Sequence, residues 1–275
     1  MPAHLDRAAF HARQFLHRLR WTADWASLWR CYRSMPGVQR LRVRFGGRAY
    51  PLHVRGGTLD LAIAQQIFCK DSEYRLPVDV SPRVIFDIGA NIGAAALYFA
   101  ARYPEAQIHC FEPLPDNLEL LKRNLAPFGS RVRIIPKGLG EQEGVFSYCF
   151  SDDPRNLGGG TFQQVGCDPR RQIELPVTTL AAYCQAEGID RIDVMKLDVE
   201  GAEYAVLRGM PADLRASIGV IVGELHGVED WALCQLLSPT HDLGLSKRLG
   251  RSCYPFTAVR RSTRQAQEPL HRLAA

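Results

Sequence analysis

The stretch Val84-Ile85-Phe86-Asp87-Ile88-Gly89-Ala90-Asn91-Ile92-Gly93 decides the fold expected for this chain. Its apolar start predicts a buried strand, and the alanine-rich run from Ala94 to Ala101 predicts a helix after a glycine turn. Glycine lets the backbone bend sharply and lets a ligand approach, while the first N–H groups of a helix have no partner within it. The stretch therefore indicates a strand, turn and helix that bind a nucleoside.

Two residues of this turn limit the choice of ligand. Asn91 stands where the second glycine of a dinucleotide-binding G-x-G-x-x-G motif would be, and the Asp87 carboxylate at the strand end would repel a pyrophosphate. S-adenosylmethionine carries an ammonium and a sulfonium and no phosphate, so the same carboxylate attracts it. We therefore expect Asp87, Gly89, Asn91 and Gly93 to bind S-adenosylmethionine and not a dinucleotide.

A second acidic residue, Glu112, follows the next predicted strand at 107–111. Its carboxylate can accept hydrogen bonds from both hydroxyls of a ribose, which would serve NAD as well as S-adenosylmethionine. An oxidoreductase is nevertheless disfavoured, because the central glycine is missing and no Tyr-x-x-x-Lys pair accompanies the site. Tyr98 is followed at that spacing by Arg102.

Composition limits the class of protein. A chain of 275 residues, 46% of them hydrophobic, can bury one large α/β core with room for extensions. It contains no apolar run long enough for a transmembrane helix and no secretory signal, so we expect a cytoplasmic protein. Its eight cysteines are scattered without metal-binding spacing, which predicts reduced thiols. The net charge of +5 comes from the two ends of the chain, and the acidic middle argues against nucleic acid as a partner.

Residues 1–55 are expected to form a basic amphipathic helical extension followed by a β-hairpin. Aromatic and aliphatic residues recur at helical spacing among arginines over residues 4–34, and apolar and basic residues alternate over 38–55. Several roles are open for the helical part. It could pack on its own domain, form a homodimer with a second copy, make a peripheral contact with the inner face of the membrane through residues 1–35, or serve as a mitochondrial presequence.

Residues 56–261 are expected to form the catalytic domain, a doubly wound α/β sheet. Strands are predicted at 83–88, 107–111, 131–135, 192–197 and 218–223, with two late strands near 243–248 and 255–260 that close the sheet. Residues 144–175 interrupt the alternation with two strands and a glycine-rich loop, which predicts an insertion over the ligand edge. Residues 262–275 are expected to be a disordered tail.

Acidic side chains gather again where two further strands end. Asp198 and Glu200 follow the strand at 192–197, and Glu224 and His226 follow the next one. Ligands of open α/β sheets bind beyond the carboxyl ends of the strands, so we expect these side chains to lie beside the cofactor loop.

Two neighbours of this group have a structural interpretation. Glu203, like Glu200, also fits the first turn of a helix, where carboxylates stabilise the dipole. Lys196 is expected to pair with a carboxylate rather than to act as a base.

Taken together, the stretches 84–93, 111–113, 193–203 and 224–226 resemble the FkbM-type S-adenosylmethionine-dependent O-methyltransferases. The resemblance covers about residues 80–230. It implies the class I methyltransferase fold, a Rossmann-like, mostly parallel sheet of seven strands with helices on both faces. It also implies that the glycine loop and Asp87 contact the methionine part, Glu112 the ribose, and Gly138 and Leu139 the adenine edge. The acceptor it implies is a sugar hydroxyl in a glycan, a glycolipid or a glycosylated natural product.

Methyl transfer from a sulfonium requires an aligned acceptor oxygen and removal of its proton. His226 is the first candidate for the base because an imidazole titrates near neutral pH, with Asp198 and Glu200 next and Glu224 orienting the imidazole or the acceptor. This mechanism needs no metal. Two alternatives are that Asp198, Glu224 and His226 hold Mg²⁺ or Mn²⁺ bound to an acceptor diol, or that the chain binds S-adenosylmethionine without catalysis.

Overall fold

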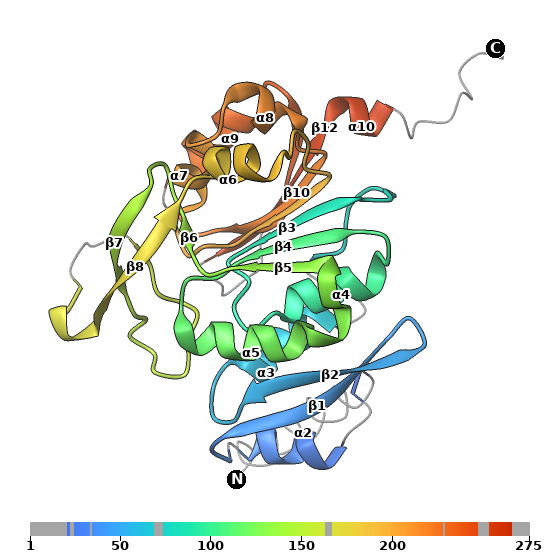
Figure 1. Cartoon of the computed structure of the whole chain (residues 1–275), viewed down its shortest axis with the longest axis vertical. Helices are drawn as coiled ribbons and strands as arrows, with labels where there is room; N and C mark the ends of the chain where they lie inside the picture. Colours follow the sequence, from blue (N-terminus) through green and yellow to red (C-terminus); the bar gives the residue numbers. More distant parts are fainter. Residues whose placement is uncertain are drawn as a thin grey trace, which may run out of the picture.

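A seven-stranded sheet forms the centre of the computed structural model, which describes residues 21–22, 25–33, 35–68, 74–162, 167–227, 229–246 and 253–265 (Figure 1). The strands of this sheet are β3 (Val84–Ile88), β4 (Gln107–Phe111), β5 (Val132–Ile135), β9 (Val194–Leu197), β10 (Val220–Leu225), β11 (His241–Leu245) and β12 (Tyr254–Arg260). Their spatial order is β11-β12-β10-β9-β3-β4-β5. The strands from β10 to β5 run parallel, and β12 runs antiparallel to both of its neighbours. The predicted class I methyltransferase fold is confirmed.

Helices cover both faces of this sheet (Figure 1). One face carries α3 (Asp60–Phe68), α4 (Ala94–Arg102) and α5 (Pro115–Leu125), and the other carries α6 (Leu180–Glu187), α7 (Glu203–Arg208), α8 (Ala212–Ser217) and α9 (Asp230–Leu237). Successive strand residues point to opposite faces, so Ile85 and Phe86 belong to different hydrophobic clusters. Two short 3-10 helices, η1 (Ala126–Arg131) and η2 (Pro169–Arg171), lie in connections.

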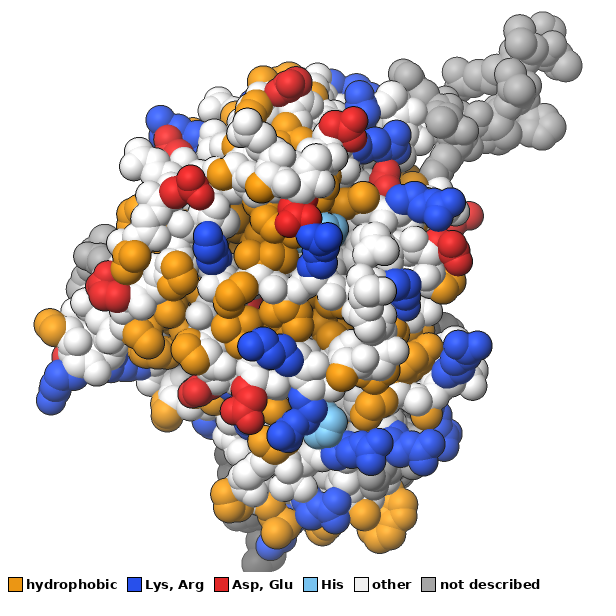
Figure 2. Space-filling view, in the orientation of Figure 1, with side chains coloured by type: hydrophobic (Ala, Val, Ile, Leu, Met, Phe, Trp, Pro, Cys, Tyr) orange, Lys and Arg blue, Asp and Glu red, His pale blue; other side chains and the backbone are white. Residues whose placement is uncertain are grey.

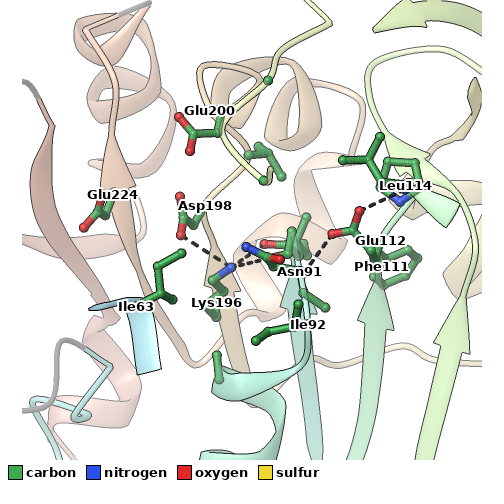
Figure 3. A pocket seen from close by; sticks show the side chains of 18 of the residues that line it. Ile63, Asn91, Ile92, Phe111, Glu112, Leu114, Lys196, Asp198, Glu200 and Glu224 are labelled. Atoms are coloured by element: carbon green, nitrogen blue, oxygen red, sulfur yellow. Dashed lines mark hydrogen bonds and ion pairs between the residues drawn. The ribbon is translucent and has the colours of Figure 1, made fainter. Parts of the chain in front are cut away.

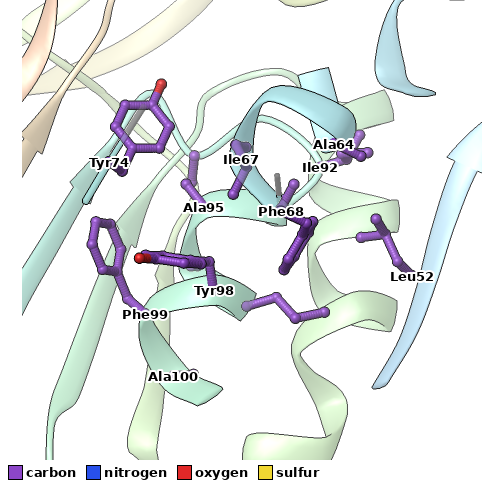
Figure 4. Packing of buried hydrophobic residues seen from close by; sticks show 14 of the residues in the cluster. Leu52, Ala64, Ile67, Phe68, Tyr74, Ile92, Ala95, Tyr98, Phe99 and Ala100 are labelled. Atoms are coloured by element: carbon purple, nitrogen blue, oxygen red, sulfur yellow. The ribbon is translucent and has the colours of Figure 1, made fainter. Parts of the chain in front are cut away.

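Helix α3 was not predicted, because its residues are apolar on most sides and give no clear helical period. It packs on α4, with Phe68 against Tyr98 at a ring separation of 6.4 Å (Figure 4). Ile67 and Ala64 are buried in the same cluster. This packing sets α3 beside the ends of the central strands.

The predicted hairpin is confirmed as β1 (Val38–Phe45) and β2 (Arg48–Arg55), paired in antiparallel register. Leu41 and Leu52 are buried in the core that α3 and α4 share, so the hairpin does not have a separate core. Helix α2 (Trp25–Tyr32) packs on β1 through the buried Leu28. Of the roles left open for the extension, packing on its own domain is confirmed for this part, whereas residues 1–20 lie outside the described residues.

The insertion forms a small sheet of its own beside the main one. Its strands β7 (Gly144–Cys149) and β8 (Gln172–Thr178) are joined by the short strand β6 (Gly138–Leu139) that precedes the insertion, in the order β6-β8-β7. The expectation that every thiol is reduced is wrong, because Cys149 and Cys167 form a disulfide across the insertion. Sequence spacing could not indicate this pair, because it depends on how the insertion folds.

The end of the chain corrects a second expectation. Residues 262–265, which were assigned to a disordered tail, belong to α10 (Arg261–Gln265), whose Arg261 and Arg264 pair with Asp242. Residues 266–275 lie outside the described residues. Among the helices that the structure does describe, none has the length and apolar composition needed to cross a bilayer.

Candidate active site

A cavity of about 340 Å³ lies at the carboxyl ends of β3, β4, β9 and β10. Its size is in the range of small-molecule sites. Most of the predicted cofactor and catalytic residues line it, namely Gly89, Asn91, Glu112, Gly138, Leu139, Asp198, Glu200 and Glu224. The cavity lining does not include Asp87, Gly93 or His226. The loop 156–162 of the insertion closes the cavity from the side, as predicted for this segment.

The glycine turn is shaped by close contact with the end of β9. Gly89 has φ +76°, and a Cβ there would lie 2.0 Å from the carbonyl oxygen of Asp198, so no side chain fits. Asn91 takes φ +50°, a left-handed conformation that asparagine tolerates better than most residues. Asn91 therefore adopts a backbone conformation that glycine would also allow at this position.

Glu112 is buried and fastens the same turn. Its Oε2 accepts a hydrogen bond from the Asn91 N–H at 2.8 Å, and its Oε1 accepts one from the Leu114 N–H at 2.9 Å (Figure 3). Burial raises the pKa of this carboxyl, although the backbone donors partly oppose the shift. Each carboxylate oxygen has a further lone pair, so Glu112 can still accept ribose hydroxyls from the cavity.

Lys196 lies between two acidic residues, Asp87 and Asp198. Its Nζ donates to the carbonyl oxygens of Ile88 at 3.1 Å and Gly89 at 2.6 Å, and it lies 3.4 Å from Asp87 Oδ1 and 3.5 Å from Asp198 Oδ2. Burial alone would lower the pKa of Lys196, but the two carboxylates raise it above its ordinary value. The prediction that Lys196 is an ion-pair partner is confirmed.

Asp198, Glu200 and Glu224 lie on the side of the cavity away from Glu112 (Figure 3), and all three surround the imidazole of His226. Nδ1 lies 2.9 Å from Glu203 Oε1 and donates its hydrogen there, since an ionised carboxylate only accepts. Nε2 therefore faces the other carboxylates, at 3.6 Å from Glu200 Oε2, 3.8 Å from Asp198 Oδ1 and 3.9 Å from Glu224 Oε2. The four residues predicted to be catalytic, Asp198, Glu200, Glu224 and His226, are therefore neighbours in the fold.

The charged side chains of this cluster shift one another's pKa values. Burial alone would lower the pKa of His226, but the hydrogen bond and charge of Glu203, with Asp198 and Glu200, raise it to about 9. Burial and the charge of Asp198 raise the pKa of Glu200 to about 7. Burial would also raise the pKa of Asp198, but Lys196 and His226 lower it. The charge of the imidazole and those of the carboxylates therefore depend on one another.

Comparison with known proteins identifies the family of this chain. The family model described as the methyltransferase FkbM domain matches residues 87–244, more than half of the chain and all of the site from Asp87 to His226. The chain belongs to the FkbM methyltransferase family. It is a methyltransferase whose cofactor is S-adenosylmethionine.

Relatives in this family act in different settings. The 31-O-demethyl-FK506 methyltransferase FkbM of Streptomyces tacrolimicus is 28% identical over 70% of this chain and 83% of its own. The hexuronic acid methyltransferase AglP of Haloferax volcanii is 28% identical over 56% of this chain and 61% of its own. AmbE of Pseudomonas aeruginosa, an AMB antimetabolite synthetase, is 28% identical over 66% of this chain, which spans only 10% of that protein. A solved predicted O-methyltransferase of Agrobacterium tumefaciens matches 68% of this chain and 78% of its own at 15% identity, with a TM-score of 0.41.

Two site residues of this family member were missed from sequence. Glu203 Oε1 accepts N–H groups from Val199 at 2.9 Å and Gly201 at 3.3 Å as well as from the imidazole, so Glu203 fixes the turn and His226 together. Its position at a helix start also fitted a dipole role, so Glu203 was not chosen as a catalytic residue. Tyr74 donates its hydroxyl to Asp198 Oδ2 at 2.9 Å, from a segment with no local signal.

Proposed function

We propose that this FkbM-family methyltransferase methylates a hydroxyl group of a sugar, in a glycan, a glycolipid or a glycosylated natural product. The observation that carries the proposal is the group of Asp198, Glu200, Glu224 and His226 at the end of the cavity away from Glu112. Hydrogen-bond acceptors of this number suit a substrate with several hydroxyls. The family and its relatives FkbM and AglP support the reaction, and AglP, a hexuronic acid methyltransferase, supports a sugar acid as one acceptor class.

The residues divide the cavity into two halves. Glu112 would bind the ribose, Gly138 and Leu139 would contact the adenine edge, and the Gly89–Asn91 turn would lie along the methionine part. S-adenosylmethionine supplies the electrophilic methyl group. Asp198 would face the sulfonium, while Glu200 and Glu224 would position the acceptor hydroxyl for in-line attack.

The reaction forms one bond and breaks another. As the acceptor oxygen bonds to the methyl carbon, the carbon–sulfur bond breaks and its electron pair stays on sulfur, which leaves a neutral thioether. The hydroxyl proton passes to the carboxylate and imidazole cluster. Asp198 and Glu200 also attract the positive charge that is present before transfer and lost after it.

A panel of acceptors tests this proposal directly. The chain is incubated with S-adenosylmethionine and uronic acid glycosides, neutral glycosides or simple alcohols, and S-adenosylhomocysteine release is measured. We expect release with one of the glycoside classes and a mass gain of one methylene on the acceptor. Cofactor binding without release for any hydroxyl acceptor would favour the non-catalytic alternative.

Replacing Glu112 by alanine should weaken S-adenosylhomocysteine binding by about 1.5–3 kcal/mol, or roughly ten- to hundredfold, the scale of hydrogen bonds to a charged group. The ribose would lose its acceptor and the Asn91 and Leu114 N–H groups their partner. Calorimetry measures the affinity, and Glu119→Ala on the exposed side of α5 is the matched control. Unchanged affinity would remove Glu112 from the cofactor site.

We also propose that residues 1–35 contact the anionic, cytoplasmic face of a membrane. The side chains of Trp25 and Trp29 are 68% and 46% exposed beside the arginines of α2 and β1, and Figure 2 shows Lys and Arg side chains gathered over this lower part of the molecule. Amphipathic segments with tryptophan and arginine favour anionic lipid.

Sedimentation with phosphatidylglycerol vesicles tests this contact. The full chain should sediment at low salt and be released at high salt, and Trp25→Ser should reduce binding several-fold. Trp231→Ser is the matched control, because Trp231 on α9 is 75% exposed and lies outside the N-terminal segment. If the chain ignores the vesicles and sediments as a dimer that Trp25→Ser dissociates, the segment is a homodimer contact instead.

A further inference from the structure

The two nitrogens of the His226 imidazole have different surroundings. Nδ1 is hydrogen-bonded to Glu203, and Nε2 faces three other carboxylates. The bond from Nδ1 to Glu203 holds the ring, and a histidine whose second nitrogen donates to a carboxylate is the arrangement found in metal sites. Nε2 lies 3.6 Å, 3.8 Å and 3.9 Å from oxygens of Glu200, Asp198 and Glu224. These distances are too long for hydrogen bonds.

The same distances fit ligands that share one small cation. Bonds of about 2.1 Å to an octahedral ion place neighbouring ligand atoms about 3 Å apart and opposite ones about 4 Å apart. The three separations from Nε2 lie between these two values, so small side-chain movements would bring the atoms to the ligand positions of one ion. Candidate ligand atoms of Asp198, Glu203 and His226 also lie within 4.8 Å of one another.

An independent feature points to a missing positive charge at this place. The second oxygen of Glu203, Oε2, is buried and accepts no hydrogen bond from the described residues, although its side chain is only 2% exposed. The buried cation nearby, Lys196, is held by Ile88 and Gly89 and pairs with Asp87 and Asp198. A buried carboxylate oxygen without a donor is costly unless another charge compensates it.

We propose that Asp198, Glu203 and the imidazole of His226, with Glu200 and Glu224 beside them, bind one divalent cation, Mn²⁺ or Mg²⁺. Oxygen ligands with one imidazole suit these ions. Glu203 Oε1 orients the imidazole, and Oε2, which has no donor among the described residues, is the oxygen left for the ion. Asp198 and Glu200 have side chains 24% and 36% exposed, so the ion can enter from the cavity.

The cation would give the cluster a second task in the reaction. An acceptor oxygen bound to it would be held beside the methyl group and would lose its proton more readily. That part of the inference rests on the proposed function, whereas cation binding itself does not. The geometry favours the metal-assisted alternative over the expectation that no metal is needed, because Nε2 has three carboxylate neighbours and no hydrogen-bond partner among them.

Binding of Mn²⁺ alone tests the site without an acceptor. The full chain is freed of metal with a chelator and titrated with Mn²⁺, and free ion is followed by electron paramagnetic resonance. We expect one site, and Asp198→Asn should weaken it at least tenfold, the scale reported when a metal site loses a supporting group. Spin-echo modulation should show coupling to an imidazole nitrogen, which His226→Gln should abolish. Glu119→Gln on α5 is the carboxylate control and should change nothing.

S-adenosylhomocysteine binding to each preparation is measured by calorimetry and reports whether the site is folded. A protein that binds this product normally but takes up no Mn²⁺ overturns the proposal. Uptake without nitrogen coupling, or uptake that Asp198→Asn and His226→Gln leave unchanged, also overturns it. Failure to bind the product while Mn²⁺ is bound with nitrogen coupling would instead contradict the cofactor part of the proposed function and leave the cation site standing.

Discussion

Lys196→Ala is expected to lower the free energy of unfolding by about 3–5 kcal/mol, the scale for removing one partner of a buried ion pair. The loss would leave Asp87, which is fully buried, without the ammonium group 3.4 Å from its Oδ1. The carbonyl oxygens of Ile88 and Gly89 would also lose a charged donor. Urea unfolding followed by circular dichroism measures the change.

Two comparisons make this result specific. Lys122→Ala removes an exposed lysine from α5 and should shift the free energy of unfolding by less than about 0.5 kcal/mol. Asp87→Asn combined with Lys196→Met removes both charges and should recover part of the loss, since a buried pair replaced as a whole costs less than a broken one. A loss below 1 kcal/mol for Lys196→Ala would show that Asp87 does not depend on Lys196.

Sequence could predict the positions that depend on the fold pattern alone. Parallel strands end at one edge of the sheet, so an acidic residue directly after a strand, such as Glu112 or Asp198, is placed at the ligand without knowledge of packing. His226 and Glu224 follow from the same rule one strand further on. The hairpin could be predicted because apolar and basic residues alternate along residues 38–55.

The remaining features depend on contacts between distant segments. Tyr74 reaches Asp198 from 124 positions away, and α3 is placed by packing on α4. The charge state of the cluster also could not be predicted, because a histidine chosen for its neutral-range pKa is bonded to Glu203, which raises that pKa to about 9. Sequence could not show how deeply the Asp87 side chain is buried. In the structure it is fully buried and is not part of the cavity lining.

His226→Ala is expected to lower turnover by about 10²–10⁴-fold, the range for loss of a positioned acid–base group. Both tasks open to the imidazole, accepting the hydroxyl proton and holding the inferred cation, require the Nε2 lone pair that faces Asp198, Glu200 and Glu224, which the ring offers once Nε2 has lost its own proton. S-adenosylhomocysteine affinity should change little, because His226 is not part of the cavity lining. Turnover is measured at saturating S-adenosylmethionine with the acceptor found in the panel.

His226→Asn separates the chemistry of Nε2 from the placement of the turn. An asparagine amide can still donate to Glu203, in the place of Nδ1, and so keep the Val199 and Gly201 contacts intact, but it offers nothing where Nε2 stood. It should therefore unfold closer to the original protein than His226→Ala and yet be as slow in transfer. Turnover within about threefold of the original for either variant would contradict a role for His226 in the reaction, since loss of a general base costs far more than that. The methyl transfer would then depend on the carboxylates alone.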